Sequence, residues 1–247
     1  MKVIAIIPAR YGSTRFPGKP LVHIMGIPMI QWVYENVKKV ETISAVYVAT
    51  DNQQIYDTVQ GFGGKALMTS SEHTCGSDRI AECLRRLNIA DETVVLNIQG
   101  DEPLIRKEMI GDLIACFDDP GVYMGTLKKL ITSEDEFVNP NVVKVITDRN
   151  GDAIYFSRYA IPYEREGKKS NHYKHIGAYG YTAKFLLQYC KLPKSDLEIA
   201  ESLEQLRVIE NGYKIRVKET QYQTIGVDTP EQIKQVEQML LKGMKNE

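Results

Sequence analysis

Three cations stand close together near the amino end of the chain, in the segment PARYGSTRFPGKPL (residues 8–21). The segment also holds two glycines and a Ser-Thr pair, and the first acidic residue of the chain, Glu35, comes only later. Arginine forks and a lysine ammonium suit several phosphate oxygens at once, and glycines let a ligand approach the backbone closely. The composition therefore predicts a phosphate-binding loop, with a solvated turn of ordinary surface cations as the alternative. The candidate phosphate ligands are Arg10, Ser13, Arg15 and Lys19.

The segments around this loop alternate between two patterns. Short apolar runs rich in β-branched residues predict buried parallel strands at residues 3–8, 45–50, 65–68 and 93–99. Between these runs, apolar residues recur at helical spacing, as in Ile30, Val33, Tyr34 and Val37. The alternation predicts an α/β fold with a doubly wound, mostly parallel, Rossmann-like sheet. Ligands of such sheets bind at the carboxyl ends of the strands, and the cationic loop follows the first strand at that end.

The middle of the chain changes to strands that are joined by turns, which predicts a β-rich insert at about residues 120–182. Within it, the polar residues 164–175 are expected to form a mobile loop. The sequence contains no internal repeat and no convincing linker. We therefore expect a single domain over residues 1–247 that carries this insert.

The carboxyl-terminal part is expected to return to regular elements. Residues 197–212 predict one helix that stops at Gly212, and residues 213–220 predict a strand. The last helix is expected to begin at Pro230, because TPEQ (229–232) has the pattern of a capping box.

The composition excludes several classes of protein. The formal net charge is −1, from 31 basic and 32 acidic residues, which argues against a protein that coats nucleic acid or a membrane surface. No run of about eighteen apolar residues occurs, so no membrane span is expected, and the amino end lacks the pattern of a signal peptide. The four cysteines have no C-x-x-C spacing. We expect a cytoplasmic protein with reduced thiols.

The cationic segment matches neither G-x-x-x-x-G-K-[ST] nor G-x-G-x-x-G, so neither a P-loop ATPase nor a dinucleotide-binding enzyme fits. It resembles the phosphate-binding signature of sugar nucleotidyltransferases, and specifically of the cytidylyltransferases that load sugar acids onto CMP. Later segments narrow the resemblance to the 3-deoxy-manno-octulosonate (Kdo) cytidylyltransferases, also called CMP-Kdo synthetases. In chain order these segments are NIQGDEP (97–103), YFSRYAIPY (155–163), YKHIGAYGY (173–181), ESLEQLR (201–207) and GVDTP (226–230).

The resemblance implies a reaction of CTP with Kdo that gives CMP-Kdo and pyrophosphate, on a nucleotide-diphospho-sugar transferase fold. Arg10, Arg15 and Lys19 would bind the triphosphate and stabilise the departing pyrophosphate. Asp101 and Asp228 match the family's metal-binding aspartates, and carboxylate oxygens suit Mg²⁺, the implied cofactor. The implied catalytic residues are Arg10, Lys19, Asp101 and Asp228, with one or two ions at the aspartates. From the residues alone, a turn former or a helix cap is an equally good interpretation of both aspartates.

The stretch CGSDR (75–79) matches the part of the family's sequence that contacts cytosine and ribose, usually written S-G-T-D-R. The implied nucleotide ligands here are Gly76, Ser77, Asp78 and Arg79. Ser77 keeps the hydroxyl group of the usual threonine, whereas Cys75 replaces the usual serine and puts any side-chain contact there in doubt. A helix start is the alternative, with Ser77 as its N-cap and an ion pair at Asp78 and Arg79.

A sugar acid carries a carboxylate and several hydroxyls, so its pocket should combine a cation with hydrogen-bonding groups. The resemblance implies that it is bound by Gln99, Arg158, His175, Tyr181, Glu204 and Gln205. Arg158 is the natural partner of the carboxylate or of a hydroxyl. As alternatives, His175 fits a satisfied structural histidine and Tyr181 a half-buried strand residue. Glu204 and Gln205 fit a solvated helix face at pair spacing to Arg207.

Rival activities are a cytidylyltransferase for 8-amino-Kdo or a sialic-type acid, and a metal-dependent glycosyltransferase. The latter would usually carry a D-x-D pair, where this chain has Asp-Glu-Pro. A non-catalytic nucleotide-binding domain would not require Lys19 together with both aspartates. The family commonly forms homodimers through its β-rich insert, so we expect a homodimer. The implied setting is the cytoplasm, in lipopolysaccharide or capsule synthesis.

Overall fold

The computed structural model describes residues 1–247 except for 13–15, 74, 166–169, 224 and 245–247. The chain divides into two compact units, one of Met1–Ile110 with Thr224–Glu247 and one of Gly111–Gln223. The second unit contains the whole of the predicted β-rich insert and extends beyond it at both ends. Among the described residues, no helix is long and apolar enough to cross a membrane.

The first unit is built on parallel strands, which confirms the prediction for this part of the chain. They are β1 (Val3–Ala9), β4 (Ile43–Thr50), β5 (Ala66–Met68) and β6 (Val94–Asn97). Their order is β6-β1-β4-β5, and every pairing between them is parallel. The chain starts at β1, moves outward through β4 and β5, and returns to β6 on the other side of β1. The strand order therefore reverses between β1 and β6, which is where ligands of such sheets bind.

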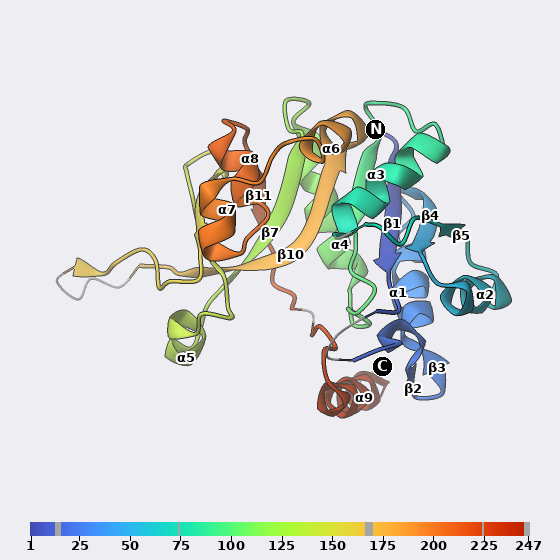
Figure 1. Ribbon diagram of the computed structural model, residues 1–247. Helices are drawn as coiled ribbons and strands as arrows, with labels where there is room; N and C mark the ends of the chain where they lie inside the picture. The colour runs from blue at the N-terminus through green and yellow to red at the C-terminus, as the bar shows by residue number, and fades with distance from the viewer. Residues whose placement is uncertain (13–15, 74, 166–169, 224, 245–247) are drawn as a thin grey trace. The chain divides into compact units, whose positions relative to one another are not determined.

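The helices α1 (Met29–Lys38), α2 (Gln53–Gly61) and α3 (Gly76–Arg86) connect these strands (Figure 1). The predicted stripe on α1 is confirmed, because it lies wholly in the core: Ile30, Val33, Tyr34 and Val37. Burial of this stripe against β4 fixes the helix on the sheet, since apolar area removed from water is the main stabilising contribution. After β6 the chain forms α4 (Lys107–Ile114) and the short η2 (Ala115–Asp118).

A smaller layer completes the first unit. The short helix η1 (Lys19–Leu21) leads into an antiparallel hairpin of β2 (His23–Ile24) and β3 (Ile27–Pro28). The last helix, α9 (Pro230–Met244), lies beside this hairpin (Figure 1). One buried cluster joins them: Ile24, Met29, Val227 and Val236. The predicted helix start is confirmed, because α9 begins at Pro230 and Gln232 Oε1 accepts the backbone N–H of Thr229 at 2.9 Å.

The second unit has a mixed sheet, as the sequence predicts. Its strands are β7 (Met124–Leu130), β8 (Lys144–Thr147), β9 (Ala153–Ser157), β10 (Tyr173–Thr182) and β11 (Arg216–Glu219). β10 pairs antiparallel with β7 and β8, β8 pairs antiparallel with β9, and β11 runs parallel to β7. A β-bulge interrupts the β10–β7 register between Ile176 and Tyr179. Thr126 Oγ1 stabilises it by donating to the Ala178 carbonyl at 2.8 Å.

Two parts of the second unit differ from the prediction. The polar segment 164–175 is not a loop throughout, because β10 begins at Tyr173; residues 166–169 lie outside the described residues. The helices α5 (Glu134–Val138) and α6 (Ala183–Tyr189) have no counterpart in the sequence-based prediction. α6 buries Phe185 and Leu186, which follow its Thr182 N-cap.

The prediction of one helix over residues 197–212 is wrong. The structure has two helices, α7 (Asp196–Glu201) and α8 (Leu206–Glu210). The break lies at Ser202, whose φ of 53° and ψ of 48° are left-handed and end a helix. Beyond α8, Gly212 has a φ of 77°, which agrees with the predicted stop at that residue.

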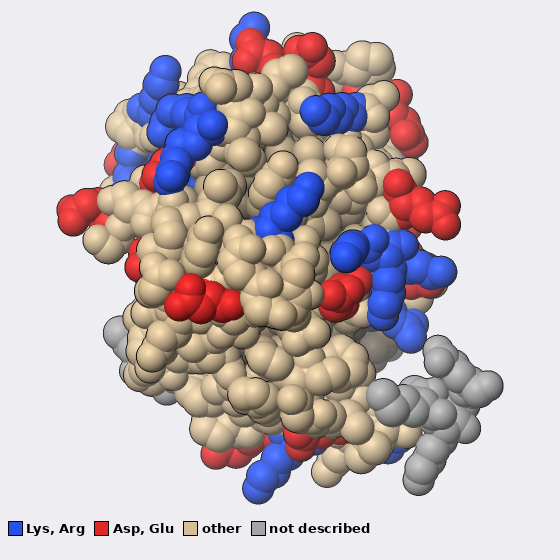
Figure 2. All heavy atoms as spheres, turned by 90° about the vertical axis from the view of Figure 1, so that its right-hand side faces the viewer, with Lys and Arg blue, Asp and Glu red and all other residues tan. Residues whose placement is uncertain are grey.

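The charges are distributed as the near-zero net charge suggests. Figure 2 shows one face of the molecule, on which basic and acidic side chains are both present. A face of this kind offers no single-sign field, so a cationic site has to be built locally.

Candidate active site

The cationic loop leaves β1 at Ala9 and returns to the sheet through η1. The backbone N–H of Gly18 closes it by donating to the carbonyl of Tyr11 at 2.9 Å. Gly18 has a φ of 70°, and a Cβ there would lie 3.1 Å from the Tyr11 ring, so the turn requires glycine. Arg10 is exposed at the end of β1, whereas Ser13 and Arg15 lie outside the described residues.

Lys19, the first residue of η1, meets both predicted metal-binding aspartates. Its Nζ lies 2.5 Å from Asp101 Oδ2 and 3.1 Å from Asp228 Oδ1. Asp101 follows β6 and Asp228 lies two residues before α9, so the three side chains come from separate parts of the sequence. The Lys19 side chain is 12% exposed, and the two carboxylates are 30% and 40% exposed. The predicted convergence of the cationic loop and the two aspartates is therefore present in the first unit.

Backbone contacts hold the two carboxylates in this arrangement. The N–H of Val227 donates to the carbonyl of Asp101 at 2.9 Å, which ties the two aspartate segments together. Gln232 Oε1 accepts the backbone N–H of Asp228 at 2.6 Å, in addition to that of Thr229. Because Val227 is fully buried in the cluster under α9, the side chain of Asp228 starts from a fixed backbone. Gly100 makes the approach of the other segment possible, since a Cβ there would lie 3.1 Å from the carbonyl of Pro8.

The pair of carboxylates fits a hard divalent cation. Both direct an oxygen at one cationic group, Lys19 Nζ, and carboxylate oxygens are what Mg²⁺ prefers. Among the described residues, no group of three or more His, Cys, Asp or Glu side chains could hold a metal ion. An ion at Asp101 and Asp228 would therefore complete its coordination with water and phosphate oxygens, as Mg²⁺ usually does at nucleotide sites.

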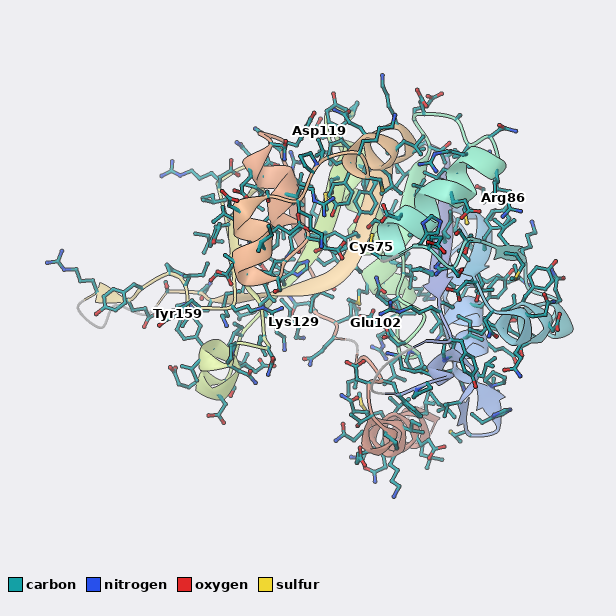
Figure 3. All side chains as sticks on the ribbon, in the orientation of Figure 1. Cys75, Arg86, Glu102, Asp119, Lys129 and Tyr159 are labelled. Atoms are coloured by element: carbon teal, nitrogen blue, oxygen red, sulfur yellow. The ribbon has the colours of Figure 1, made fainter. Side chains whose placement is uncertain are left out.

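The start of α3 carries the predicted nucleotide ligands. Cys75 is its N-cap, because the Cys75 Sγ accepts the backbone N–H of Asp78 at 3.5 Å and also contacts Asp78 Oδ2 at 3.2 Å. The alternative that Ser77 caps this helix is therefore wrong; Ser77 lies within the first turn and is 5% exposed. In Figure 3, Cys75 and Arg86 mark the two ends of the helix. Gly76 packs against Pro8 at the end of β1, which brings this helix start to the carboxyl edge of the sheet.

Arg79 is turned into the protein. It is 3% exposed, and its guanidinium donates to Asp51 Oδ2 at 2.7 Å and to Thr69 Oγ1 at 2.5 Å. The ion pair expected at the helix start is thus made with Asp51, after β4, and not with the neighbouring Asp78. Arg79 therefore links α3 to the ends of two strands, because Thr69 directly follows β5.

The residues implied for sugar binding lie in both units. In the first unit, Gln99 Nε2 donates to Asn97 Oδ1 at 3.3 Å. In the second, rings on β10 and α6 form a continuous series. His175 lies 5.3 Å from Tyr179 between ring centroids, Tyr179 stacks on Tyr181 at 6.0 Å, and Tyr181 stacks on Tyr189 at 6.2 Å. Burial lowers the pKa of His175 to about 3, so the imidazole is neutral at neutral pH.

The series continues into the α7–α8 turn. Tyr189 Oη donates to the carbonyl of Glu204 at 3.3 Å, and Glu204 itself is exposed. Gln205 is 5% exposed, and its Nε2 has no hydrogen-bond partner within the described residues. The interpretation of Gln205 as part of a solvated helix face is therefore wrong. Three of the implied sugar ligands, His175, Tyr181 and Glu204, are thus connected through Tyr179 and Tyr189, and Gln205 is the next residue after Glu204.

Two tyrosines of this series, Tyr179 and Tyr189, are absent from the sequence-based list. Burial raises the pKa of both phenols, so both stay protonated and able to donate. The spacing of Tyr189 from Phe185 and Leu186 on α6 would have shown that it is buried. Its contact with the turn at Glu204 depends on the tertiary fold and leaves no local signal.

Arg158 follows β9, and its guanidinium faces backbone carbonyls. Arg158 Nε donates to the carbonyl of Glu201 at 2.7 Å, and its two terminal nitrogens donate to those of Pro140 at 3.1 Å and Ser202 at 3.4 Å. The structure thus places Arg158 at the end of α7, next to the turn that carries Glu204 and Gln205.

Comparisons of the sequence and the structure with known proteins all find cytidylyltransferases. A family model described as "Cytidylyltransferase" matches residues 4–215. A 3-deoxy-manno-octulosonate cytidylyltransferase of Thermodesulfovibrio yellowstonii is 51% identical over 97% of this chain and 98% of that protein. A protein of the same name from Fusobacterium nucleatum is also 51% identical, over 96% of each chain. A solved structure of CMP:2-keto-3-deoxy-manno-octonic acid synthetase complexed with CTP superposes with a TM-score of 0.93. It is 44% identical and covers 98% of this chain and all of that one.

Proposed function

Because the chain belongs to the cytidylyltransferase family, among the 3-deoxy-manno-octulosonate cytidylyltransferases, we propose that it transfers CMP from CTP to Kdo. The anomeric hydroxyl of Kdo attacks the α-phosphorus in line, which forms CMP-Kdo and releases pyrophosphate. The observation that carries the proposal is the convergence of Lys19, Asp101 and Asp228 at the reversal of strand order. It provides a cation and two hard ligands where such a sheet binds a nucleotide.

On the nucleotide side, the residues neutralise and orient charge. Phosphoryl transfer needs little covalent chemistry from a protein, so its contribution is positioning and electrostatic stabilisation. Lys19 and Arg10 would bind the phosphate oxygens and stabilise the charge that grows on the departing pyrophosphate. The start of α3, with Gly76 and Ser77, would bind the cytidine.

The two aspartates are proposed to hold Mg²⁺. When bound, this ion would supply charge neutralisation at the α-phosphate and the leaving group. The aspartates fit this role, because their oxygens already converge on one cationic group and their backbones are fixed. Lys19 would then turn from the carboxylates to the phosphates, which a flexible four-carbon stem permits.

On the sugar side, the cluster of His175, Tyr181, Glu204 and Gln205 is proposed to bind the hydroxyls of Kdo. The buried Gln205 Nε2 supports this, since a buried amide without a partner is costly unless a ligand accepts its hydrogen bond. The neutral His175 adds a group that can donate or accept but carries no charge.

The proposed setting is the cytoplasm, in the synthesis of lipopolysaccharide or capsule, and the proposed assembly is a homodimer. The proposal of a reduced compartment is supported by the four cysteines, none of which forms a disulfide. The dimer is supported by exposed apolar side chains after β9. Tyr159 is 83% exposed and points out from an extended segment (Figure 3), and Tyr163 is 88% exposed.

Pyrophosphate release tests the reaction. The purified chain is mixed with Kdo, Mg²⁺ and one of CTP, ATP, GTP or UTP, with Asp101→Asn prepared in parallel as the inactive control. We expect release with CTP alone among the four nucleotides. Equal release with all four nucleotides, or none with CTP, would refute the proposal. Kdo and its 8-amino analogue at equal concentration separate the two related substrates.

A further inference from the structure

One apolar cluster contacts all three segments that carry the charged groups of the candidate site. Its buried members, which have no exposed surface, are Ile24, Met29, Val227 and Val236. Phe16, from the cationic loop, and Leu104, from the loop after β6, pack against the same cluster. Val227 is the residue before Asp228. The ammonium and the two carboxylates therefore share one packed base, and a close-packed base transmits any shift to all three.

The last helix, α9, supplies one side of this cluster. Val236 is buried in it, and Ile233 and Leu240 pack against it. Their spacing of three and four residues places these three side chains on one face of the helix. Asp228 lies two residues before α9, so a shift of the helix would move this carboxylate.

A polar contact ties the same helix to the hairpin of β2 and β3. Glu237, the residue after Val236, accepts the backbone N–H of Met25 through Oε1 at 3.0 Å. Met25 lies in the hairpin turn with a φ of 50°, a left-handed conformation that residues other than glycine keep only when their surroundings hold them. The contact therefore fixes the turn and the helix to each other. The proposed reaction gives neither Glu237 nor Met25 a role.

The single tryptophan of the chain lies at this junction. Trp32, on α1, packs against the cluster, and its Nε1 donates to the carbonyl of Ile24 in the hairpin at 3.0 Å. The emission of an indole depends on the packing and polarity around its ring. Trp32 is therefore a built-in probe of whether the hairpin and α9 stay docked.

We propose that Glu237 is a positioning residue for the metal-bound nucleotide. By tying α9 to the hairpin, it keeps the cluster packed and so fixes the carboxylate of Asp228 relative to Asp101. This separation matters because Mg²⁺ demands near-ideal octahedral geometry. Glu237 acts through the backbone of α9 and does not contact the phosphates or the metal. The inference rests on the proposed function, because it assigns to α9 the task of setting the geometry of the proposed Mg²⁺ site.

Two variants of Glu237 separate the hydrogen bond from the charge. Glu237→Ala removes both, whereas Glu237→Gln keeps an acceptor for the N–H of Met25. The Mg²⁺ concentration for half-maximal pyrophosphate release should rise about fivefold in Glu237→Ala and stay at the wild-type value in Glu237→Gln. The KM for CTP at saturating Mg²⁺ should be unchanged in both. An equal rise in Glu237→Gln would show that the charge acts and would overturn the anchor.

The matched control is Gln238→Ala, at the neighbouring exposed position of α9. It makes the same change to alanine on the same helix but removes no contact with the hairpin. We expect the wild-type Mg²⁺ requirement in this variant. A rise equal to that of Glu237→Ala would assign the effect to the helix itself and refute the role of Glu237.

The emission of Trp32 measures metal binding without turnover. Mg²⁺ is titrated into the protein with CTP but without Kdo, so that no CMP is transferred to the sugar. The midpoint of the emission change should lie at about fivefold higher Mg²⁺ in Glu237→Ala than in the wild type or in Gln238→Ala. A wild-type emission that does not respond to Mg²⁺, or the same midpoint in Glu237→Ala, would overturn the proposal.

Hydrogen exchange tests the anchor in the absence of nucleotide. The N–H of Val227 donates to the carbonyl of Asp101, so its exchange reports the contact between the two aspartate segments. This amide should exchange about fivefold faster in Glu237→Ala, while amides of β4 stay unchanged. Unchanged exchange at Val227 would overturn the anchor. If the wild-type chain fails to release pyrophosphate with CTP and Kdo, the proposed function fails, and this exchange still decides whether Glu237 fixes the segment of Asp228.

Discussion

Lys19 Nζ lies 2.5 Å from Asp101 Oδ2, although 82 residues separate the two in the sequence. The contact joins the loop after β1 to the loop after β6, the two strands between which the strand order reverses. The same ammonium reaches Asp228 at 3.1 Å and so neutralises part of the charge of both carboxylates. The proposed Mg²⁺-bound nucleotide would thus meet two carboxylates that Lys19 already holds together.

Replacing Lys19 should separate its catalytic role from its structural one. In Lys19→Ala, kcat should fall about 10²-fold or more, because the charge that grows on the leaving pyrophosphate loses a fixed cation. The two carboxylates also lose their shared counter-charge, so Mg²⁺ should raise the Tm of this variant more than that of the wild type. Steady-state kinetics and thermal unfolding with and without Mg²⁺ measure both effects. Lys2→Ala, at an exposed site before β1, is the control, and a normal kcat in Lys19→Ala would remove this lysine from the mechanism.

Asp101→Asn should nearly abolish turnover and raise the Mg²⁺ concentration needed for what remains. The substitution keeps the shape of the side chain but removes the charge that a hard cation requires. A Mg²⁺ titration of pyrophosphate release measures the change, and Asp91→Asn in the exposed turn before β6 is the matched control. Normal activity of Asp101→Asn at low Mg²⁺ would show that the metal lies elsewhere.

The meeting of the cationic loop with Asp101 could be predicted because it follows from strand order, whereas Asp228 is assigned to the same site by the family resemblance. Apolar runs identify β1 and β6, and parallel strands place the residues after them at one edge of the sheet. The helix start at Pro230 could be predicted as well, because the residues TPEQ (229–232) have the pattern of a capping box. Sequence patterns specify the direction and order of these elements, and with them the position of Asp101.

The features that the sequence did not predict depend on contacts between distant residues, which leave no local sequence pattern. Ser202 breaks the predicted helix, and the carbonyls freed at this break are bound by Arg158 from another strand. Arg79 pairs with Asp51, 28 residues away, instead of with its neighbour. Lys144 is a charged residue within β8, yet it is fully buried. In each case the side chain binds hydrogen-bond partners that come close to it only in the folded chain.

Replacing the N-cap residue of α3, Cys75, by serine should stabilise the start of this helix. Cys75 Sγ accepts the Asp78 N–H at 3.5 Å, and a serine hydroxyl is a stronger acceptor at an N-cap. Cys75→Ser should raise the unfolding free energy by a few tenths of a kcal/mol up to about 1 kcal/mol, while Cys75→Ala should lower it. The KM for CTP should stay within about twofold in Cys75→Ser, because serine is the family's usual residue there. Urea unfolding and CTP titration measure both; a large rise in this KM would give the sulfur a role in nucleotide binding.

Disrupting the exposed tyrosines after β9 should convert a dimer to monomers. Large apolar side chains that are exposed on the single chain commonly mark an interface, and Tyr159 and Tyr163 lie close together in the sequence. The double variant Tyr159→Ser with Tyr163→Ser should halve the mass measured by light scattering. Leu241→Ser, which removes an exposed apolar side chain from α9, should not change it. A wild-type chain that is monomeric at all concentrations would refute the homodimer.

The buried imidazole of His175 should make the protein less stable in mild acid. Burial lowers its pKa to about 3 from a usual value of 6.5, so between these values the unfolded chain binds a proton that the folded chain does not. Its contribution to stability is therefore complete above about pH 6.5 and is lost as the pH falls toward 3, by at most about 1.4 kcal/mol per pH unit. His175→Gln removes this contribution, so its unfolding free energy should fall less steeply between pH 7 and pH 5 than that of the wild type. Urea unfolding at both pH values measures the difference, with His23→Gln at an exposed site as the control. Equal slopes for the wild type and His175→Gln would mean that folding leaves the pKa of this imidazole unchanged, and so that burial does not hold it neutral.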